Sequence, residues 1–585
     1  MNNKREMDMK KIIKPVVKKI EDNSQELIYL QEELKSEILL DFPVVYIHSW
    51  KNGNAYEIYI GETNNIIQRT REHLKKSANP DQWQYQLKQK KSNLYIIGHK
   101  HFNKSLTLDI ENRLMLYMMS AENVKKIHNL RGNAQRRYYT DCEMDLIFQM
   151  IWEELQQDNK ELFPKESEIK DSAVFKASPL HKLTEEQETV KNSIVEKVFD
   201  SLKTKEKDQL IFIEGEAGTG KTVLNSSTFY EILSSVQEEK KEPVKCSLIV
   251  NHDEQITVYK QIAQKLGLVE RYGVDICKPT PFINRHTEEN PIDVAFIDEA
   301  HLLLTQGKQS YTGKNQLEDI IKRARVTVVM FDENQILTAE QYWEAKRLKH
   351  YKELSKQQNN YFELKNQLRI KAPKEVINWI DDFTKNKKIS KIPKNQGEYE
   401  IKIFDNPYEL ESALKKKAKK KEHRLSRLIA TYDWKYNAKT QSEKRVSKYW
   451  EVAIGEWHKP WNRELNQGLD RKTKIQNKTL SWAEQSHTIE EVGSTFTIQG
   501  FDLSYAGVIL GPSVKYENGK IKFDTAKSWN KKAVQNRTLS DGTKQKFGEI
   551  LIQHEVRVLM TRGVEGLYIY ACDSALKEAL LDAAK

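Results

Sequence analysis

The stretch QLIFIEGEAGTGKT at residues 209–222 decides the fold class of this 585-residue chain. A β-branched and aromatic run, typical of a buried strand, leads directly into GEAGTGKT, and a helical pattern follows. The segment matches G-x-x-x-x-G-K-[ST], in which a tight loop points backbone amides at phosphate oxygens. We therefore predict a nucleotide site, with Lys221 on the β- and γ-phosphates and Thr222 on Mg²⁺. The loop glycines are Gly215, Gly218 and Gly220.

A second motif, DVAFIDEAH at residues 293–301, closes a predicted strand with two carboxylates. In this interpretation Asp298 holds Mg²⁺ through water, and Glu299 polarises the attacking water. From residue 183 onward strand-like runs alternate with helical segments, which predicts an α/β fold with parallel sheets. The later runs RLIATY, TFTIQG, AGVILG and GLYIYA predict the strands of a second α/β lobe.

Composition excludes several classes of protein. Lys and Arg total 95 against 84 for Asp and Glu, a net charge of +11, and 38% of residues are hydrophobic. No apolar run approaches the ~20 residues that cross a bilayer, and the N-terminus lacks the pattern of a secretory signal. The four cysteines form no CxxC pair. We expect a cytoplasmic, multidomain protein without membrane association and with a weak preference for acidic partners such as nucleic acid.

The N-terminal part of the chain has its own pattern. The runs FPVVYIHSW at residues 42–50 and YEIYIG at residues 56–61 flank a Gly/Asn turn, which predicts a β-hairpin. A helix, another strand and an apolar-faced helix follow, so that a small α/β unit ends near residue 140.

The motifs after residue 183 resemble those of superfamily 1 helicase-type NTPases, most closely the family that relates bacterial helicase-like proteins to Schlafen helicase domains. LTEEQ, FDENQ, LKNQLRI, STFTIQGFDLSYAGVILG and HEVRVLMTRG follow the family order around the two phosphate motifs. The resemblance implies that Gln187 reads the adenine edge, that Gln335 couples the γ-phosphate to nucleic acid, and that Arg369 faces the phosphates. It also implies two arginine fingers, Arg557 and Arg562.

Two positions depart from the family pattern. Asp502 stands where glutamate is frequent, and His554 stands where asparagine is frequent. Because of these departures, the sequence does not decide which nucleotide the protein prefers or how strongly ATP hydrolysis is coupled to nucleic acid.

The N-terminal unit resembles the GIY-YIG endonuclease fold over residues 42 to about 140. Its first motif, VYI, is degenerate because Val45 replaces the glycine, whereas the second, YIG, is intact. Phosphodiester hydrolysis needs a phosphate clamp and a divalent metal, and Arg69 and Glu111 are suited to these roles. The resemblance implies that Tyr46 is the general base and that Tyr59 orients the site.

A tyrosine base needs help from its surroundings. Its pKa starts near 10, so action at neutral pH requires nearby cations to lower it by about 3 units. His73, one turn beyond Arg69, would support that network. Asn133 resembles the late polar residue of the family, and Asn129 competes for this position.

The tryptophans of the second lobe allow two interpretations. They alternate with basic residues, so they could stack on the bases of a single strand. Tryptophans at this density more often fill a core or a seam between lobes. They are Trp434, Trp450, Trp457 and Trp461.

These patterns together predict an ATP- and Mg²⁺-dependent nuclease–helicase acting on DNA, with a role in bacterial anti-phage defence or restriction. Alternatives are an RNA-directed enzyme, or a nucleic-acid sensor with an NTPase switch and a binding-only head. The sequence does not decide whether the chain forms a homo-oligomer or binds a partner defence protein. The expected parts are a helical segment at 1–40, a nuclease-like domain at 41–140, a helix and linker at 141–182, and RecA-like lobes at 183–350 and 351–585.

Overall fold

The computed structural model describes residues 13–23, 25–26, 37–76, 78, 82–128, 138–204, 206–238, 244–308, 310–437 and 448–585. Contacts divide the chain into two compact units. The first comprises Met1–Lys182 and Val258–Val274, and the second comprises Leu183–Thr257 and Asp275–Lys585. None of the helices in the described ranges combines the length and the apolar character that crossing a membrane requires.

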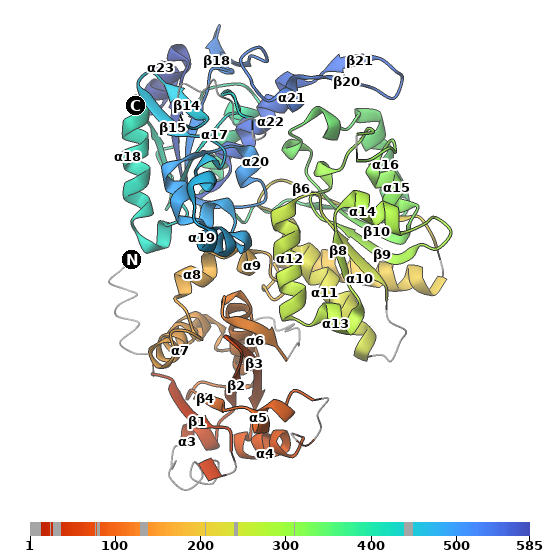
Figure 1. The fold of residues 1–585 in the computed structure, drawn as a ribbon, viewed down its shortest axis with the longest axis vertical. Coiled ribbons are helices and arrows are strands. Elements are labelled where there is room, and N and C mark those ends of the chain that lie inside the picture. The colour runs from red at the N-terminus through yellow and green to blue at the C-terminus, as the bar shows by residue number, and fades with distance from the viewer. Residues whose placement is uncertain are drawn as a thin grey trace. The chain divides into compact units, whose positions relative to one another are not determined.

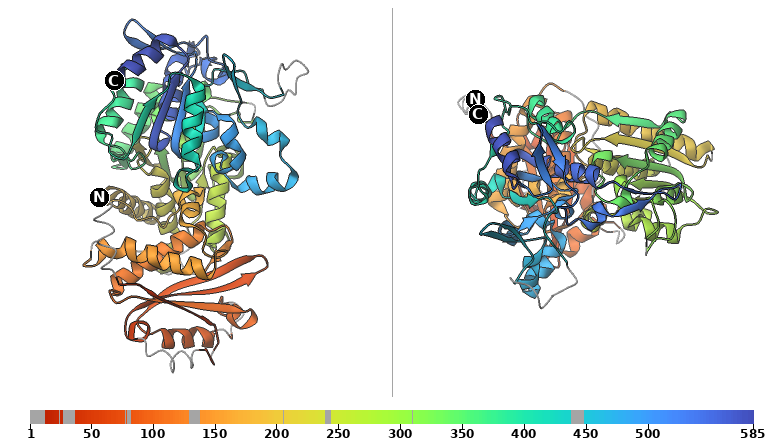
Figure 2. Two further views of the ribbon diagram at one scale, coloured as in Figure 1. Left: turned by 90° about the vertical axis from the view of Figure 1, so that its left-hand side faces the viewer. Right: turned by 90° about the horizontal axis from the view of Figure 1, so that it is seen from above.

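A five-stranded sheet in the order β1-β4-β2-β3-β5 forms the N-terminal unit, red to orange in Figure 1. The predicted hairpin is confirmed, since β2 and β3 pair antiparallel and Gly53 in their turn has a φ of +67°. Helices cover both faces of the sheet (Figure 2, left). The strands are β1 Val16–Glu21, β2 Val44–Asn52, β3 Ala55–Thr63, β4 Ser92–Gly98 and β5 Val124–Ile127, and the helices are α3 Glu37–Leu40, α4 Ile66–Lys76, α5 Tyr85–Gln89, α6 Lys104–Ser120 and α7 Met144–Asp158.

The helical segment predicted for residues 1–40 is wrong where β1 forms, at Val16–Glu21. This strand pairs antiparallel with β4. Pro15 disfavours a helix that runs through this point, and the run that follows is rich in β-branched residues. β1 lies at the edge of the sheet, and its two lysines protect that edge from further pairing.

The segment predicted as a linker, residues 158–182, is packed. Leu162 and Phe163 are fully buried, and Trp152 Nε1 donates to the carbonyl oxygen of Pro164 over 3.0 Å. Apolar residues inside a charged, proline-containing stretch therefore dock on the preceding helix. The segment forms the short helices α8 Glu166–Asp171 and α9 Ala173–Lys176.

A six-stranded parallel sheet in the order β11-β6-β10-β9-β7-β8 forms the first lobe of the second unit, which confirms the predicted βαβ pattern. The lobe extends past residue 350, where the sequence placed its end, because β11 pairs with β6. The strands are β6 Gln209–Gly215, β7 Cys246–Ile249, β8 Asp275–Cys277, β9 Ile292–Ile297, β10 Ala324–Phe331 and β11 Tyr361–Leu364. The helices are α10 Glu185–Thr204, α11 Lys221–Glu238, α14 Pro279–Arg285, α15 Gln316–Ile321 and α16 Ala345–Gln357. Helix α12 Asp253–Lys265 begins in this lobe and continues into the segment Val258–Val274 of the first unit, which also contains α13 Leu268–Tyr272.

A second parallel sheet, β12-β22-β17-β13-β16, forms the other lobe. Its strands are β12 Glu400–Ile403, β13 Arg427–Ala430, β16 Val492–Gly493, β17 Leu503–Leu510 and β22 Gly563–Ala571. Its helices are α17 Lys374–Thr384, α18 Pro407–Ala418, α19 Arg471–Gln476, α20 Thr495–Ile498, α21 Lys531–Val534, α22 Gly548–Met560 and α23 Ser574–Ala583. Three hairpins join them: β14 Glu451–Ile454 with β15 Trp457–Pro460, β18 Val514–Glu517 with β19 Lys520–Phe523, and β20 Asn536–Thr538 with β21 Lys544–Lys546.

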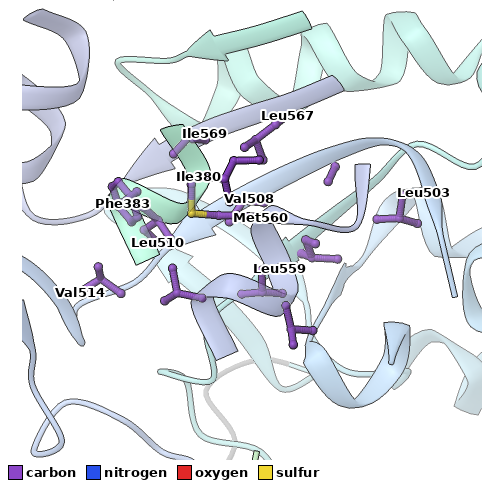
Figure 3. Packing of buried hydrophobic residues seen from close by; sticks show 14 of the residues in the cluster. Ile380, Phe383, Leu503, Val508, Leu510, Val514, Leu559, Met560, Leu567 and Ile569 are labelled. Atoms are coloured by element: carbon purple, nitrogen blue, oxygen red, sulfur yellow. The ribbon is translucent and has the colours of Figure 1, made fainter. Parts of the chain in front are cut away.

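The core of this lobe positions functional side chains. Ile380 and Phe383 from α17 pack with Leu559 and Met560 from α22 against β17 and β22 (Figure 3). The same two helices carry polar residues of the nucleotide site described below. Apolar packing therefore sets where those polar residues lie.

For this lobe, one prediction about secondary structure is wrong and one about buried tryptophans is confirmed. TFTIQG was predicted as a strand, which is wrong: it forms α20, and the backbone N–H of Ser494 donates to Thr497 Oγ1 (2.9 Å) in a capping box that favours a helical turn. Trp457 and Trp461 are buried in an apolar cluster with Tyr568. For these two side chains the core interpretation is confirmed.

Candidate functional site

The phosphate-binding motif forms the loop between β6 and α11, at the carboxyl end of its strand, where open parallel sheets bind ligands. Gly218 and Gly220 have φ values of +88° and +77°, which residues with a Cβ rarely adopt. Lys221 is buried, and its Nζ donates to the carbonyl oxygens of Gly215 (2.7 Å) and Glu216 (2.9 Å). The lysine is thus folded back on the loop that would hold phosphate.

Gln187 of α10 is bound to the same loop. Its Nε2 donates to the carbonyl oxygen of Thr219 (3.0 Å), and its Oε1 accepts the backbone N–H of Thr184 (3.0 Å). The side chain is buried. The residue predicted to read adenine therefore lies beside the phosphate loop and braces it, while its adenine role stays a prediction.

The acidic pair follows β9 directly, and both side chains are buried. The backbone N–H of Glu299 donates to Asp298 Oδ1 (3.0 Å), and Glu299 has a left-handed backbone with φ +49°. Such strained positions cluster at functional sites. Burial acts to raise the pKa of Glu299, but the charges of His301, Lys221 and Arg562 outweigh it and lower that pKa. An ionised, buried carboxylate of this kind can accept a hydrogen bond from a water.

A continuous chain of polar side chains links the phosphate loop to the second lobe. Lys221 Nζ lies 3.5 Å from Asp332 Oδ2, which accepts Gln335 Nε2 (2.7 Å), and Gln335 Oε1 accepts Arg562 Nη2 (2.9 Å). All four side chains are buried. Burial acts to raise the pKa of Asp332, but Lys221 and His301 lower it overall. Burial lowers the pKa of Arg562 to about 10.

Arg557 of α22 makes a second connection between the lobes. Its Nη2 donates to Glu216 in the phosphate loop (2.7 Å), and its Nη1 pairs with Asp381 on α17. Lys385 pairs with the same two carboxylates, at 2.6 Å from Glu216 and 3.0 Å from Asp381. We call these four residues the charge ring. The ring gives the predicted arginine finger a protein carboxylate as its partner at the mouth of the phosphate loop.

Arg369 and the two departures from the family pattern also make contacts. Arg369 Nε lies 2.6 Å from Asp502 Oδ1. A Cβ on Gly218 would come within 2.7 Å of the Arg369 Cβ, so the loop and this arginine approach closely only because residue 218 is glycine. His554 Nδ1–H donates to the carbonyl oxygen of Ile336 (3.0 Å). Asp502 therefore contacts the motif that contains Arg369, and His554 contacts the residue that follows FDENQ.

Four members of this network were not predicted from the sequence. Asp332 directly follows β10, and its place at the carboxyl end of a parallel strand was a usable signal. Glu216 occupies a position that the phosphate motif leaves unspecified. Asp381 lies on α17 and Lys385 directly follows that helix at i,i+4 spacing, but no pattern in the sequence shows what these two side chains contact.

A polar cluster in the N-terminal unit centres on Tyr46. Its hydroxyl accepts Arg69 Nε (3.2 Å) and lies 3.1 Å from His73 Nε2, and the Tyr59 ring lies 6.1 Å away. Tyr46 faces Gly61 across the hairpin, and a Cβ there would lie 2.5 Å from the Tyr46 hydroxyl oxygen. The glycine of YIG therefore makes room for this phenol. The fold brings together Tyr46, Tyr59, Arg69 and His73.

The expected lowering of the Tyr46 pKa is wrong. Burial raises the pKa of Tyr46, Tyr59 adds to the rise, and Arg69 opposes it without overcoming it. Burial likewise lowers the pKa of His73 to about 3, with His48 and Arg69 acting in the same direction. The centre of the cluster is thus a neutral phenol beside a neutral imidazole.

Of the remaining N-terminal candidates, the structure describes Glu111 alone. Glu111 is buried in α6, which packs on β2 and β3. Asn133 and its competitor Asn129 lie outside the described residues.

The described ranges contain no group of three or more His, Cys, Asp or Glu side chains arranged for a metal ion. Mg²⁺ often binds through one or two carboxylates with water and substrate phosphates. Thr222 and Asp298 in the nucleotide site, and Glu111 in the N-terminal unit, are ligands of that partial type.

Comparison with known proteins identifies the family of the helicase-like part of the chain. Residues 208–573 match the family model described as Schlafen group 3, DNA/RNA helicase domain. An uncharacterized protein of Saccharomyces cerevisiae, YPL245W, is 32% identical over 442 residues, which span 69% of this chain and 91% of the yeast protein.

Proposed function

The chain belongs to the Schlafen group 3 DNA/RNA helicase domain family, and from this premise we propose that it is an ATP-dependent nuclease–helicase acting on DNA. The second unit is a helicase-like domain of a nucleic-acid-related NTPase family. The observation that carries the proposal is the chain from Lys221 through Asp332 and Gln335 to Arg562. It runs from the phosphate loop of one lobe to an arginine of the HEVRVLMTRG motif in the other, as a motor that couples hydrolysis to lobe movement requires.

In the proposed NTPase cycle, Lys221 exchanges its carbonyl partners for the β- and γ-phosphates of ATP. Thr222 and Asp298 would hold Mg²⁺, which neutralises phosphate charge when bound. Glu299 orients and polarises the attacking water, and Arg557 and Arg562 stabilise the charge that develops during transfer. Gln187 would read the adenine edge and Arg369 would face the phosphates.

The N-terminal unit is proposed to cut phosphodiester bonds with a GIY-YIG-like site. Arg69 would clamp the scissile phosphate, and Glu111 would hold a Mg²⁺ that offsets phosphate charge. The grouping of Tyr46, Tyr59, Arg69 and His73 around one hydroxyl supports this assignment. A role in anti-phage defence or restriction follows from joining such a cutter to a motor.

The alternative function is a nucleic-acid sensor for DNA or RNA, with an NTPase switch and a binding-only head. The buried, neutral Tyr46 and the degenerate VYI motif favour this alternative for the head.

One experiment separates these functions. The full chain is incubated with plasmid, linear DNA and RNA in Mg²⁺, with and without ATP, beside Glu111→Ala and Lys221→Ala. We expect Glu111→Ala to abolish cleavage while ATP turnover persists, and Lys221→Ala to abolish ATP turnover. Glu122→Ala and Lys203→Ala, at exposed positions, are the matched controls. Cleavage that survives Glu111→Ala would refute the catalytic role of Glu111, and ATP turnover that survives Lys221→Ala would refute the role of Lys221 in the nucleotide site.

A further inference from the structure

A buried Asp–His pair lies inside the N-terminal unit. His48 Nδ1 lies 2.8 Å from Asp22 Oδ1 and 2.9 Å from Asp22 Oδ2, and both side chains are fully buried. Asp22 directly follows β1, and its backbone N–H donates to the carbonyl oxygen of Ser92 (3.1 Å). The edge strand that the sequence analysis missed is therefore the element that brings this carboxylate to His48.

The pair belongs to the same side of the sheet as the Tyr46 cluster. Tyr46 and His48 alternate along β2, and His48 lies directly opposite Tyr59 on β3. Four rings enclose the His48 ring, at centroid distances of 5.4 Å for Tyr46, 6.2 Å for Tyr59, 5.3 Å for His73 and 5.6 Å for Trp83. The pair thus borders the group of side chains that we assign to cleavage.

The hydrogen bonds to Asp22 decide the tautomer of His48. Carboxylate oxygens only accept, so Nδ1 carries the proton and Nε2 presents a lone pair. Within the described part of the chain that Nε2 is buried and has no hydrogen-bond partner. An unpaired polar atom in such a place is costly, and an ordered water, a bound ion or a catalytic role can account for it.

Tyr59 is the group that can connect His48 to solvent. Tyr46 is only 1% exposed and its hydroxyl already contacts Arg69 and His73, whereas Tyr59 is half-buried. Tyr59 also stacks on Trp83 at 4.2 Å, which holds its ring in place. Its ring lies opposite His48 at a centroid distance of 6.2 Å, and because no hydrogen bond joins the two side chains in the described residues, a bridging water would have to carry a proton between them.

We propose that Tyr59, His48 and Asp22 form a proton relay for phosphodiester hydrolysis, in which His48 receives the proton and Asp22 positions it. This inference rests on the proposed nuclease function of the N-terminal unit. It reassigns proton acceptance from Tyr46, which remains a positioning residue with Arg69.

The oxygen of a water forms a bond to phosphorus while the P–O bond to the leaving alkoxide breaks. The attacking water passes a proton to the Tyr59 oxygen as Tyr59 passes its own proton through the bridging water to His48 Nε2, and solvent protonates the alkoxide. His48 then returns its proton to solvent through Tyr59. The resulting imidazolium is stabilised by Asp22, as in other Asp–His pairs.

The test measures plasmid cleavage by the full chain in Mg²⁺ across a pH series. The variants are His48→Gln, Asp22→Asn and Tyr59→Phe. We expect each to slow cleavage by about 10²-fold or more, and His48→Gln and Asp22→Asn to remove one ionisation from the pH–rate profile. The other titratable groups facing His48 are Asp22, Tyr46, Tyr59 and His73, so Tyr46→Phe serves to show that this ionisation is not that of the Tyr46 phenol.

His101→Gln is the matched control, because His101 pairs with Glu143 in the same unit but outside the cluster. Thermal unfolding of the N-terminal unit reports whether each variant folds, and Tyr59→Phe removes only one hydroxyl, so it keeps the test decisive if a buried variant unfolds. Wild-type rates in folded His48→Gln, or slower cleavage with an unchanged pH profile, would overturn the relay alone. A wild-type chain that cuts no nucleic acid overturns the relay together with the nuclease function.

Discussion

Arg562 of the second lobe donates from Nη2 to Gln335 Oε1 of the first lobe over 2.9 Å, and the other end of that amide donates to Asp332. Gln335 is thus the only side chain in the described chain of contacts from Lys221 to Arg562 that bonds residues of both lobes.

Gln335→Ala should uncouple nucleic-acid binding from ATP hydrolysis. It removes a partner from two buried charged groups, and such hydrogen bonds contribute about 1.5–3 kcal/mol, equivalent to roughly 10- to 100-fold. We expect stimulation of ATP turnover by nucleic acid to fall by this factor, with ATP binding retained. Steady-state ATPase assays with and without DNA or RNA measure the effect. Glu333→Gln, at the exposed neighbouring position, is the control, and equal stimulation in Gln335→Ala would contradict the coupling role.

Glu216→Gln should tighten ATP binding, because it releases Arg557 and Lys385 from the charge ring. Glu216 is 45% exposed, so its ion pairs are partly screened by water and contribute about 0.2–1 kcal/mol each. We expect the KM for ATP to fall about 2- to 5-fold with kcat unchanged. By contrast, Arg557→Ala should lower kcat by about 10³-fold if Arg557 acts as an arginine finger. Glu206→Gln is the surface control, and a raised KM in Glu216→Gln would rule out competition between Glu216 and the nucleotide.

Glu555 of α22 should make the second unit less stable as the pH rises. It is 1% exposed and accepts the backbone N–H of Tyr432 (2.9 Å). Burial, with Asp433 adding to it, raises the pKa of Glu555 to about 8. Between roughly pH 4.3 and 8 the folded state therefore keeps a proton that the unfolded state loses, so the free energy of unfolding falls through this range.

The expected loss from Glu555 between pH 6 and 8 is about 2 kcal/mol, and Glu555→Gln should remove it. Thermal unfolding at pH 6, 7 and 8 measures the slope in both proteins. The exposed Glu578→Gln should keep the wild-type slope. An identical slope in Glu555→Gln would show that the carboxyl ionises normally in the folded state.

Gly61→Ala should disturb the N-terminal unit alone. The added Cβ would lie 2.5 Å from the Tyr46 hydroxyl oxygen, and overpacking of a buried site costs about 1–3 kcal/mol. We expect a lower unfolding temperature for this unit and slower cleavage, while ATP turnover stays at the wild-type level. Gly468→Ala, where the nearest atom is 4.0 Å away, is the control. Unchanged stability and cleavage would mean that Tyr46 shifts freely.

The sequence predicted the parallel sheets and the phosphate loop because their signals are local. A β-branched run followed by a glycine-rich loop is compatible with few other folds. Gly218 and Gly220 adopt the positive φ that the motif requires. Local signals failed where packing decided. TFTIQG has strand-like residues but forms a capped helical turn, and the charged N-terminal run contains an edge strand.

By itself the sequence determined which chemical groups the chain carries and the order of its motifs, from Gln187 through Lys221 and Asp298 to Arg562. Only the tertiary structure decided which groups meet: Glu216 with Arg557, Gln335 with Arg562, and Asp22 with His48. These partners are far apart in the chain, so their approach depends on helix packing and strand order. The tertiary structure also decided that Tyr46 is a neutral phenol, because burial outweighs the charge of the neighbouring Arg69.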